Sequence, residues 1–179
     1  MKNKIGLYIG RFQPFHNGHL YMVREALKNC DHLIIAIGSA QESRTEKNPF
    51  TNSERAIAIA WSIPLIAADR ITIISVNDRK NKADNSSWGE YLLKEVEKLS
   101  GMRPDVCFTG EEQVRQHWFD TVDIEEVIIK RDIIPVSATQ VREAIKNNNQ
   151  ELFNSLVPKG TQNLWKLMRE VLNNEREDA

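Results

Sequence analysis

Short apolar runs that alternate with helical patterns constrain the fold of this chain more than any other feature. Strands are expected at residues 5–9, 32–37, 71–76, 106–108 and 126–129. The first three are almost entirely apolar, which is typical of parallel strands that are covered on both faces. Because a helical pattern separates each run from the next, the chain is expected to form a doubly wound α/β fold around one parallel sheet, with further helices at its C-terminal end.

Helical patterns fill the segments between these runs. Helices are expected at residues 19–29, from a capping box of Thr51 and Glu54 through Trp61, and at 88–99, 111–118, 138–147 and 162–173. The apolar face of the last helix comprises Leu164, Leu167, Met168 and Val171. Trp61 and Trp165 also lie on apolar helix faces and are expected in the core. No linker is evident, so residues 1–179 are expected to form a single domain with a frayed tail at 173–179.

Composition narrows the classes of partner. The net charge is −1, so the chain has no overall basic field for nucleic acid, and an anionic ligand would need a local cluster of donors. Cys30 and Cys107 lie among apolar residues without metal-type spacing, which favours free thiols in a reducing cytosol. No stretch approaches the roughly 20 apolar residues of a membrane helix. We therefore expect a soluble, cytoplasmic protein that binds neither nucleic acid nor membranes.

The stretch IGLYIGRFQPFHNGH, which comprises the first strand and the residues directly after it, carries the first candidate site. Ligands of open α/β sheets bind beyond the carboxyl ends of the strands, and a helix N-terminus there suits phosphate. Gly10 permits close approach of the backbone, and Arg11 adds a planar cation. His16 and His19 are three residues apart and should project from the same side of the first helical turn, where they could hold phosphoryl oxygens. A zinc pair would lack an evident third ligand, and the dinucleotide fingerprint G-x-G-x-x-G is absent.

Two later segments carry further candidates. Ser137 and Thr139 precede a helix that contains Arg142, so they either cap that helix or form a second anion site with the arginine. Trp88 follows the polar run DNSS that includes Asn85, and an exposed indole there could stack on a cationic pyridinium ring.

Five blocks of the sequence together resemble a known family. They are GRFQPFHNGHL, IGSAQESR followed by NPFTNSER, DNSSW, FTG and VSATQVREAI. The first block is similar to the signature of the (H/T)xGH nucleotidyltransferases, and the ordered set is similar to the nicotinamide-nucleotide adenylyltransferases of the archaeal type. This resemblance implies a Rossmann-like nucleotidyltransferase fold. It also implies transfer of the adenylyl group of ATP to nicotinamide mononucleotide (NMN), which forms NAD and pyrophosphate, with Mg²⁺ carried by the ATP phosphates.

The resemblance also implies roles for individual residues. The catalytic residues would be His16, His19, Arg11 and Arg142. The residues that bind ATP would be Gly10, Phe12, Gln13, Gly18, Gly110, Ser137 and Thr139. The residues that bind the acceptor would be Ser39, Lys47, Asn85 and Trp88. The chain departs from the family at Lys47, where an arginine is usual, so either Lys47 serves in its place or Arg44 substitutes. No cluster of carboxylates suggests a metal bound by the protein itself.

Several alternatives stay open at this level. The same chemistry could act on FMN or phosphopantetheine, or transfer a cytidylyl group, and a nucleotide-binding regulator without turnover is a further alternative. Nicotinamide and nicotinate mononucleotide are not distinguished as acceptors. Archaeal members of the family are often hexameric, so the resemblance also implies a homo-oligomer.

Overall fold

The computed structural model describes residues 3–79, 86–110, 118–130 and 133–174 of the chain. The strands are β1 (Ile5–Gly10), β2 (His32–Ile37), β3 (Ile71–Ser75), β4 (Val106–Thr109) and β5 (Glu125–Ile128). The helices are α1 (Asn17–Leu27), α2 (Asn52–Ser62), the 3₁₀ helix η1 (Leu65–Arg70), α3 (Ser86–Ser100), α4 (Ala138–Lys146), α5 (Gln150–Leu156), α6 (Lys159–Gln162) and α7 (Trp165–Asn174). All five expected strands are present, each within two residues of its expected ends.

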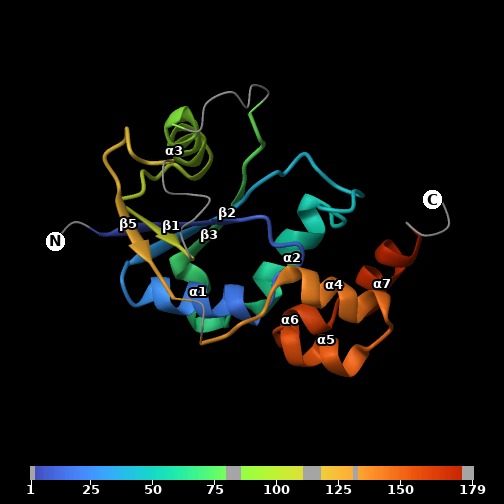
Figure 1. Ribbon diagram of the computed structural model, residues 1–179. Helices are drawn as coiled ribbons and strands as arrows, with labels where there is room; N and C mark the ends of the chain where they lie inside the picture. Colours follow the sequence, from blue (N-terminus) through green and yellow to red (C-terminus); the bar gives the residue numbers. More distant parts are fainter. Residues whose placement is uncertain (1–2, 80–85, 111–117, 131–132, 175–179) are drawn as a thin grey trace.

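The five strands form one parallel sheet in the order β3-β2-β1-β4-β5 (Figure 1). The chain builds outward from β1 to β3 and then crosses to β4 on the other side of β1. Such a reversal creates a crevice at the carboxyl ends of the two central strands, where ligands of doubly wound sheets bind. The expected fold class is confirmed, and the crevice lies beyond the ends of β1 and β4.

Alternating strand residues divide the core into two layers. Leu7 and Ile34 pack with the apolar face of α3, whereas Tyr8 and Ile35 pack with α1 and α2 on the opposite face. The two layers follow from the two-residue period of a strand, which sends successive side chains to opposite faces. Figure 1 shows α3 on one side of the sheet and α1 on the other.

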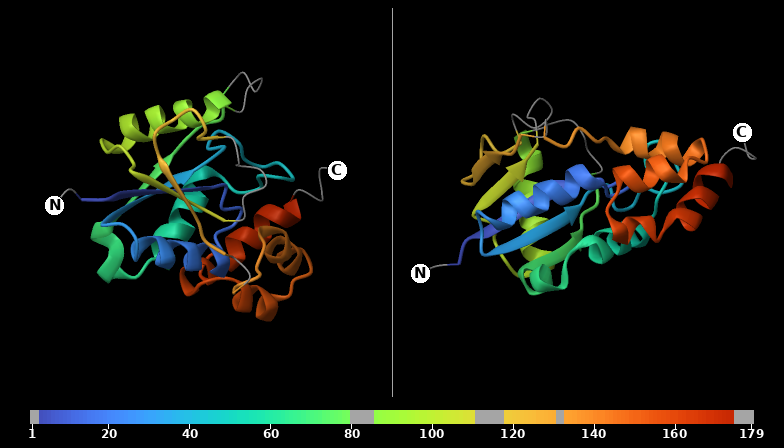
Figure 2. Two further views of the ribbon diagram at one scale, coloured as in Figure 1. Left: turned by 60° about the vertical axis from the view of Figure 1, so that its left-hand side comes forward. Right: turned by 90° about the horizontal axis from the view of Figure 1, so that it is seen from below.

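The C-terminal helices form a cluster at one end of the sheet, beside α2 (Figures 1 and 2). Helix α4 packs on α5 and α7, and α6 packs on α2. The contact between α6 and α2 is close enough that a Cβ atom on Gly160 would overlap the backbone of Trp61. This cluster places the N-terminus of α4 near the loop that follows β1.

Several local predictions are wrong. Trp61 is 58% exposed, because the buried stripe of α2 is formed by Arg55, Ala58 and Ile59 and position 61 lies off it. Leu167 is 37% exposed for the same reason, since Leu164, Met168 and Leu172 form the buried stripe at the C-terminal end.

Three helices were not predicted, and one prediction lies outside the described residues. The last helix begins at Trp165, and α5 and α6 precede it. Both are short, as is η1, and helices of one or two turns carry too little periodicity to be detected. The helix expected at 111–118 falls almost entirely outside the described part of the chain. No helix in the described ranges is both long and apolar enough to cross a membrane.

Candidate active site

The loop between β1 and α1 turns the Phe12 ring into the core. Gly10 allows this, because a Cβ atom there would lie 2.9 Å from the Phe12 ring. Phe12 has a left-handed backbone (φ 52°), is 1% exposed and meets the His19 ring edge-to-face with centroids 4.9 Å apart. Phe12 was expected to bind ATP. Its buried ring packs against the His19 ring instead, so only the main chain of Phe12 is available to a ligand.

Gln13 joins this loop to the segment before α2. Its Nε2 donates to the Phe50 carbonyl oxygen at 3.0 Å, and the Phe50 N–H donates to its Oε1 at 2.9 Å. The side chain is 3% exposed. Its amide is therefore held by the main chain of Phe50, and its expected contact with ATP stays a prediction.

The two histidines stack on each other at the start of α1. His16 is the N-cap residue and His19 lies in the first turn, with ring centroids 3.6 Å apart. This confirms that both rings lie on one side of the helix. The His16 main-chain N–H donates to Nδ1 of His19 at 3.3 Å. Because Nδ1 accepts this bond, neutral His19 carries its proton on Nε2, the ring atom that is able to donate to a phosphoryl oxygen.

The N-terminus of α4 is tied directly to this loop. Arg142 Nη1 donates to the Gln13 carbonyl oxygen at 2.8 Å, and Nη2 donates to Thr139 Oγ1 at 3.3 Å. Ser137 caps the helix, since its Oγ accepts from the Gln140 N–H at 3.2 Å. The capping alternative therefore holds for Ser137. The bond from Arg142 to the Gln13 carbonyl oxygen brings the first turns of α4 beside the loop that precedes α1. Helix N-termini favour anions, so this arrangement suits a phosphate-bearing ligand.

Gly18 permits the close approach of these two segments. A Cβ atom at Gly18 would lie 3.1 Å from the His16 ring and 3.3 Å from the Val136 carbonyl oxygen. These separations are tighter than ordinary van der Waals contacts. The expected role of Gly18 in ATP binding is thus accompanied by a packing role, which brings the residue before Ser137 against the first turn of α1.

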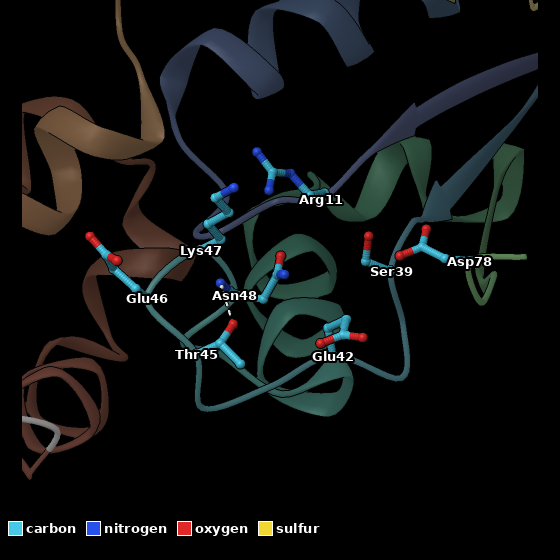
Figure 3. A pocket seen from close by; sticks show the side chains of 8 residues that line it. All are labelled: Arg11, Ser39, Glu42, Thr45, Glu46, Lys47, Asn48 and Asp78. Atoms are coloured by element: carbon cyan, nitrogen blue, oxygen red, sulfur yellow. Dashed lines mark hydrogen bonds between the residues drawn. The ribbon is translucent and has the colours of Figure 1, made fainter. Parts of the chain in front are cut away.

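A pocket of about 480 Å³ opens beside this loop (Figure 3). Its lining residues are Arg11, Ser39, Glu42, Thr45, Glu46, Lys47, Asn48 and Asp78. Figure 3 shows the side chains of Arg11 and Lys47 directed toward the same part of the pocket, with Ser39 and Asp78 on another side. Three of the expected site residues, Arg11, Ser39 and Lys47, therefore come together from three separate segments.

Arg44 is engaged elsewhere. Its Nη1 and Nη2 donate to the two carboxylate oxygens of Glu54 at 2.8 and 2.6 Å, and Nη1 also donates to the Pro49 carbonyl oxygen. Burial alone would raise the pKa of Glu54, but the hydrogen bonds from Arg44 and from Thr51 outweigh it and lower the pKa. Of the two candidates for the family's usual arginine, Lys47 is the one that lines the pocket.

Three arginines concentrate positive charge around these segments. Burial lowers the pKa of Arg142, and repulsion by Arg11 lowers it further. The same two causes, in the same order, lower the pKa of Arg55 to about 10. Arg11 thus lies within electrostatic reach of both other guanidinium groups. An anion bound among them would relieve this repulsion, so the arrangement favours a phosphate-bearing ligand.

Trp88 is half-buried at the start of α3, where it was expected to be exposed. Its ring meets Tyr91 (centroids 5.3 Å apart) and Trp118 (5.9 Å), and no acceptor in the described part of the chain lies within reach of its Nε1. Tyr91 Oη donates to the Asn77 carbonyl oxygen at 3.0 Å, one residue before Asp78 of the pocket. Trp88 therefore lies in an aromatic group that adjoins the pocket wall, while Asn85 lies outside the described residues.

Gly110 follows β4 at the ligand edge of the sheet. Tyr8 of β1 pairs with Phe108 of β4. Gly10 and Gly110 each follow two residues later, so they lie side by side at the carboxyl ends of the two central strands. Gly110 is buried there, and its contact with ATP stays a prediction. The described residues include no group of three or more His, Cys, Asp or Glu side chains placed to hold a metal ion.

Arg55 is the main residue of the site that the sequence reasoning missed. It is 1% exposed and donates hydrogen bonds to carbonyl oxygens that surround the pocket. A signal was present, because Arg55 falls on the apolar stripe of its helix with Ala58 and Ile59. A buried arginine at such a position needs several acceptors, which indicates convergent main-chain carbonyls.

Comparison with known proteins assigns the chain to a family. The family model described as cytidylyltransferase-like matches residues 7–150. A nicotinamide-nucleotide adenylyltransferase of Thermococcus onnurineus is 34% identical over 173 residues, which cover 94% of this chain and 85% of the relative. The chain belongs to the nicotinamide-nucleotide adenylyltransferase family. The relative of that name from Pyrococcus furiosus is also 34% identical and covers 94% and 86% of the two chains.

A solved structure extends the likeness of this adenylyltransferase-family chain to the fold. The bifunctional NMN adenylyltransferase/ADP ribose pyrophosphatase of Francisella tularensis, in complex with AMP and a Mn ion, superposes with a TM-score of 0.76 at 25% identity. The match covers 97% of this chain and 52% of that protein, so the chain spans about half of the bifunctional neighbour. The adenylyltransferase family suggested by the five sequence blocks is thereby confirmed.

Proposed function

We propose that the protein transfers the adenylyl group of ATP to NMN and so forms NAD and pyrophosphate. An oxygen of the NMN 5′-phosphate forms a bond to the α-phosphorus of ATP. The bond from that phosphorus to the oxygen that bridges the α- and β-phosphates breaks, and its electron pair leaves with pyrophosphate. The nucleophile is already an anion, so catalysis depends on positioning and on stabilising the charge of the departing group. The relatives from Thermococcus onnurineus and Pyrococcus furiosus are named for this activity.

The observation that carries the proposal is the bond from Arg142 to the Gln13 carbonyl oxygen. It ties the N-terminus of α4 to the loop that also presents Arg11, His16 and His19. These joined segments carry two helix N-termini, two imidazoles and two guanidinium groups to the space beyond the carboxyl ends of the central strands. We assign the ATP triphosphate to this space, with His19 Nε2–H and Arg142 as donors to the phosphoryl oxygens.

We assign NMN to the adjoining pocket. Arg11 and Lys47 would neutralise the 5′-phosphate, and the hydroxyl or main chain of Ser39 would orient it. The pyridinium ring would lie toward Trp88, whose indole packs against Tyr91 and Trp118 and could attract a cationic ring. Asn85 and Gly110 keep the roles that the family resemblance gives them, on the carboxamide and the adenosine respectively.

The cation, the location and the assembly follow as further parts of the proposal. Mg²⁺ bound to the triphosphate would neutralise charge on the departing pyrophosphate. Free thiols at Cys30 and Cys107 fit a reducing cytoplasm.

Three large apolar side chains are exposed at and after the end of α2: Trp61 (58%), Leu65 (92%) and Ile66 (91%). We expect these side chains to be covered in a homo-oligomer. Sedimentation velocity would detect such an assembly.

The test is pyrophosphate release with ATP and Mg²⁺ in the presence of NMN, nicotinate mononucleotide, FMN or phosphopantetheine. Turnover with the pyridine nucleotides alone, with NAD or its deamido form as product, is the expected result and would rank the two acceptors. Turnover with FMN or phosphopantetheine alone would overturn the acceptor assignment. ATP binding without pyrophosphate release from any of the four would identify a regulator without turnover.

A further inference from the structure

Arg55 is a buried cation whose hydrogen bonds, within the described residues, all go to main-chain carbonyl oxygens. The acceptors are the carbonyl groups of Arg11 (3.1 Å), Gly38 (2.9 Å), Ser39 (3.2 Å), Glu42 (3.4 Å) and Thr51 (3.3 Å). A charge that is 1% exposed is costly unless its donors are satisfied. Arg55 thus gathers five acceptors from three segments that are distant in sequence.

Two of these segments are strand ends with unusual backbone geometry. Phe12, which follows the Arg11 carbonyl group, has φ 52°, and Ser39 has φ 48°. Left-handed backbone is unfavourable for residues other than glycine and persists only where the surroundings hold it. Arg55 binds the carbonyl group of Ser39 and the one directly before Phe12, so it is placed to hold both turns.

Three of the same carbonyl groups belong to residues that line the pocket, namely Arg11, Ser39 and Glu42. Their side chains face the pocket while their carbonyl groups lie on Arg55. The main-chain ladder joins β1 to β2 as far as Gly10 and Gly38. Arg55 connects the turns that follow these strands, so it is placed to hold Arg11 relative to Ser39.

We infer that Arg55 is a positioning residue for the acceptor phosphate: it holds Arg11 and Ser39 in the arrangement that binds the phosphate, without touching the substrate itself. This inference rests on the proposed function, since the phosphate in question is that of NMN. The charge of Arg55 also acts on the site, because Arg11 and Arg55 repel each other and a bound anion relieves that repulsion.

The planar shape of arginine is essential to this role. Nη1 donates to the carbonyl oxygens of Arg11 and Gly38, Nη2 donates to those of Ser39 and Glu42, and Nε donates to that of Thr51. Lysine would keep the charge, but its three donors project from a single nitrogen atom and cannot satisfy five acceptors that are spread around three nitrogen atoms. An Arg55→Lys variant therefore separates geometry from charge.

The experiment compares Arg55→Lys with Arg70→Lys in steady-state kinetics. Arg70 is a matched control, because it also donates to three carbonyl oxygens, those of Leu27, Cys30 and Asp31, at the opposite end of β2. We expect R55K to raise KM for NMN about tenfold, equivalent to about 1.4 kcal/mol, with KM for ATP and kcat within about twofold of wild type. R70K should leave both KM values unchanged even where it lowers Tm.

A variant that is only less stable would contain less folded enzyme, so its apparent kcat would fall while its KM stayed unaltered. A raised KM for NMN at unchanged kcat therefore identifies a positioning role. Equal KM values for NMN in R55K and R70K would overturn the inference. If R55K does not fold, Arg55→Ala is assayed with 20 mM guanidinium chloride against 20 mM sodium chloride. Recovery of NMN binding with guanidinium alone supports the role, and equal binding in both salts, or no fold in either, refutes it. Absence of NAD synthesis by the wild type would instead refute the proposed function.

Discussion

The main-chain N–H of His16 donates to Nδ1 of His19, and this bond assigns the proton of the His19 ring to Nε2. The relationship also explains the spacing of the two histidines. His16 begins the helix as its N-cap residue, and a side chain three residues later reaches back to the N-cap main chain, as in a capping box. One local bond thus contributes to the start of α1 and selects the tautomer that we propose to donate to phosphate.

Three substitutions of His19 separate these two roles. Asparagine keeps an acceptor at the position of Nδ1 but has no donor at the position of Nε2, whereas glutamine keeps the distal donor. We expect His19→Ala and His19→Asn to lower kcat about 10²–10³-fold, as for loss of one donor to developing charge, and His19→Gln to retain more activity than either. Single-turnover NAD formation measures this. Equal turnover in all three variants and the wild type would rule out the donor role.

Lys47 and Arg44 should differ in what they affect. Lys47 lines the pocket, so Lys47→Ala should raise KM for NMN by about tenfold through loss of a charge contact to phosphate. Arg44→Ala should instead lower Tm while KM changes little, because Arg44 pairs with Glu54. Kinetics and thermal unfolding of both variants test this. The assignment fails if Arg44→Ala is the variant that weakens NMN binding.

Trp88 should affect the acceptor and not ATP. Trp88→Ala removes the ring proposed to face the pyridinium, and a cation–π contact of about 1–2 kcal/mol predicts a rise of roughly 5- to 30-fold in KM for NMN. Trp88→Phe should recover part of this loss. Trp61→Ala is the matched control, since Trp61 is 58% exposed and lies on another helix. A proportional rise in KM for ATP in Trp88→Ala would contradict stacking on the acceptor.

Stability at acid pH should depend on Glu54. Its pKa is lower in the folded protein than the ordinary value of 4.5, so protonation favours the unfolded chain. The stabilisation is fully present above the ordinary value and is lost as the pH falls through the lower, folded value. Urea unfolding from pH 7 to pH 3 should therefore show a smaller loss of stability below about pH 4.5 in Glu54→Gln than in wild type.

The partner of Glu54 provides the control for that measurement. Arg44→Ala removes the hydrogen bonds that lower the pKa of Glu54, so it should flatten the acid limb in the same way. An acid limb as steep as that of wild type in both variants would show that another carboxylate dominates.

Much of the fold followed from local patterns. The strand at residues 32–37, the capping box of Thr51 and Glu54, and the helix end at Gly101 (φ 71°) were all predictable, because each depends on neighbours within a few residues. The pairing of His16 with His19 was predictable for the same reason.

The sequence by itself therefore determined the parallel sheet, the helix starts and the residue types at the anion site, since these follow from periodicity and short-range hydrogen bonds. Only the tertiary structure decided which polar side chains remain available to a ligand. Gln13 is occupied by Phe50, 37 residues away, and Arg55 by Arg11, 44 residues away. Such partners meet only when separate segments pack together, and a buried polar group must then bond whatever acceptor the packing brings to it.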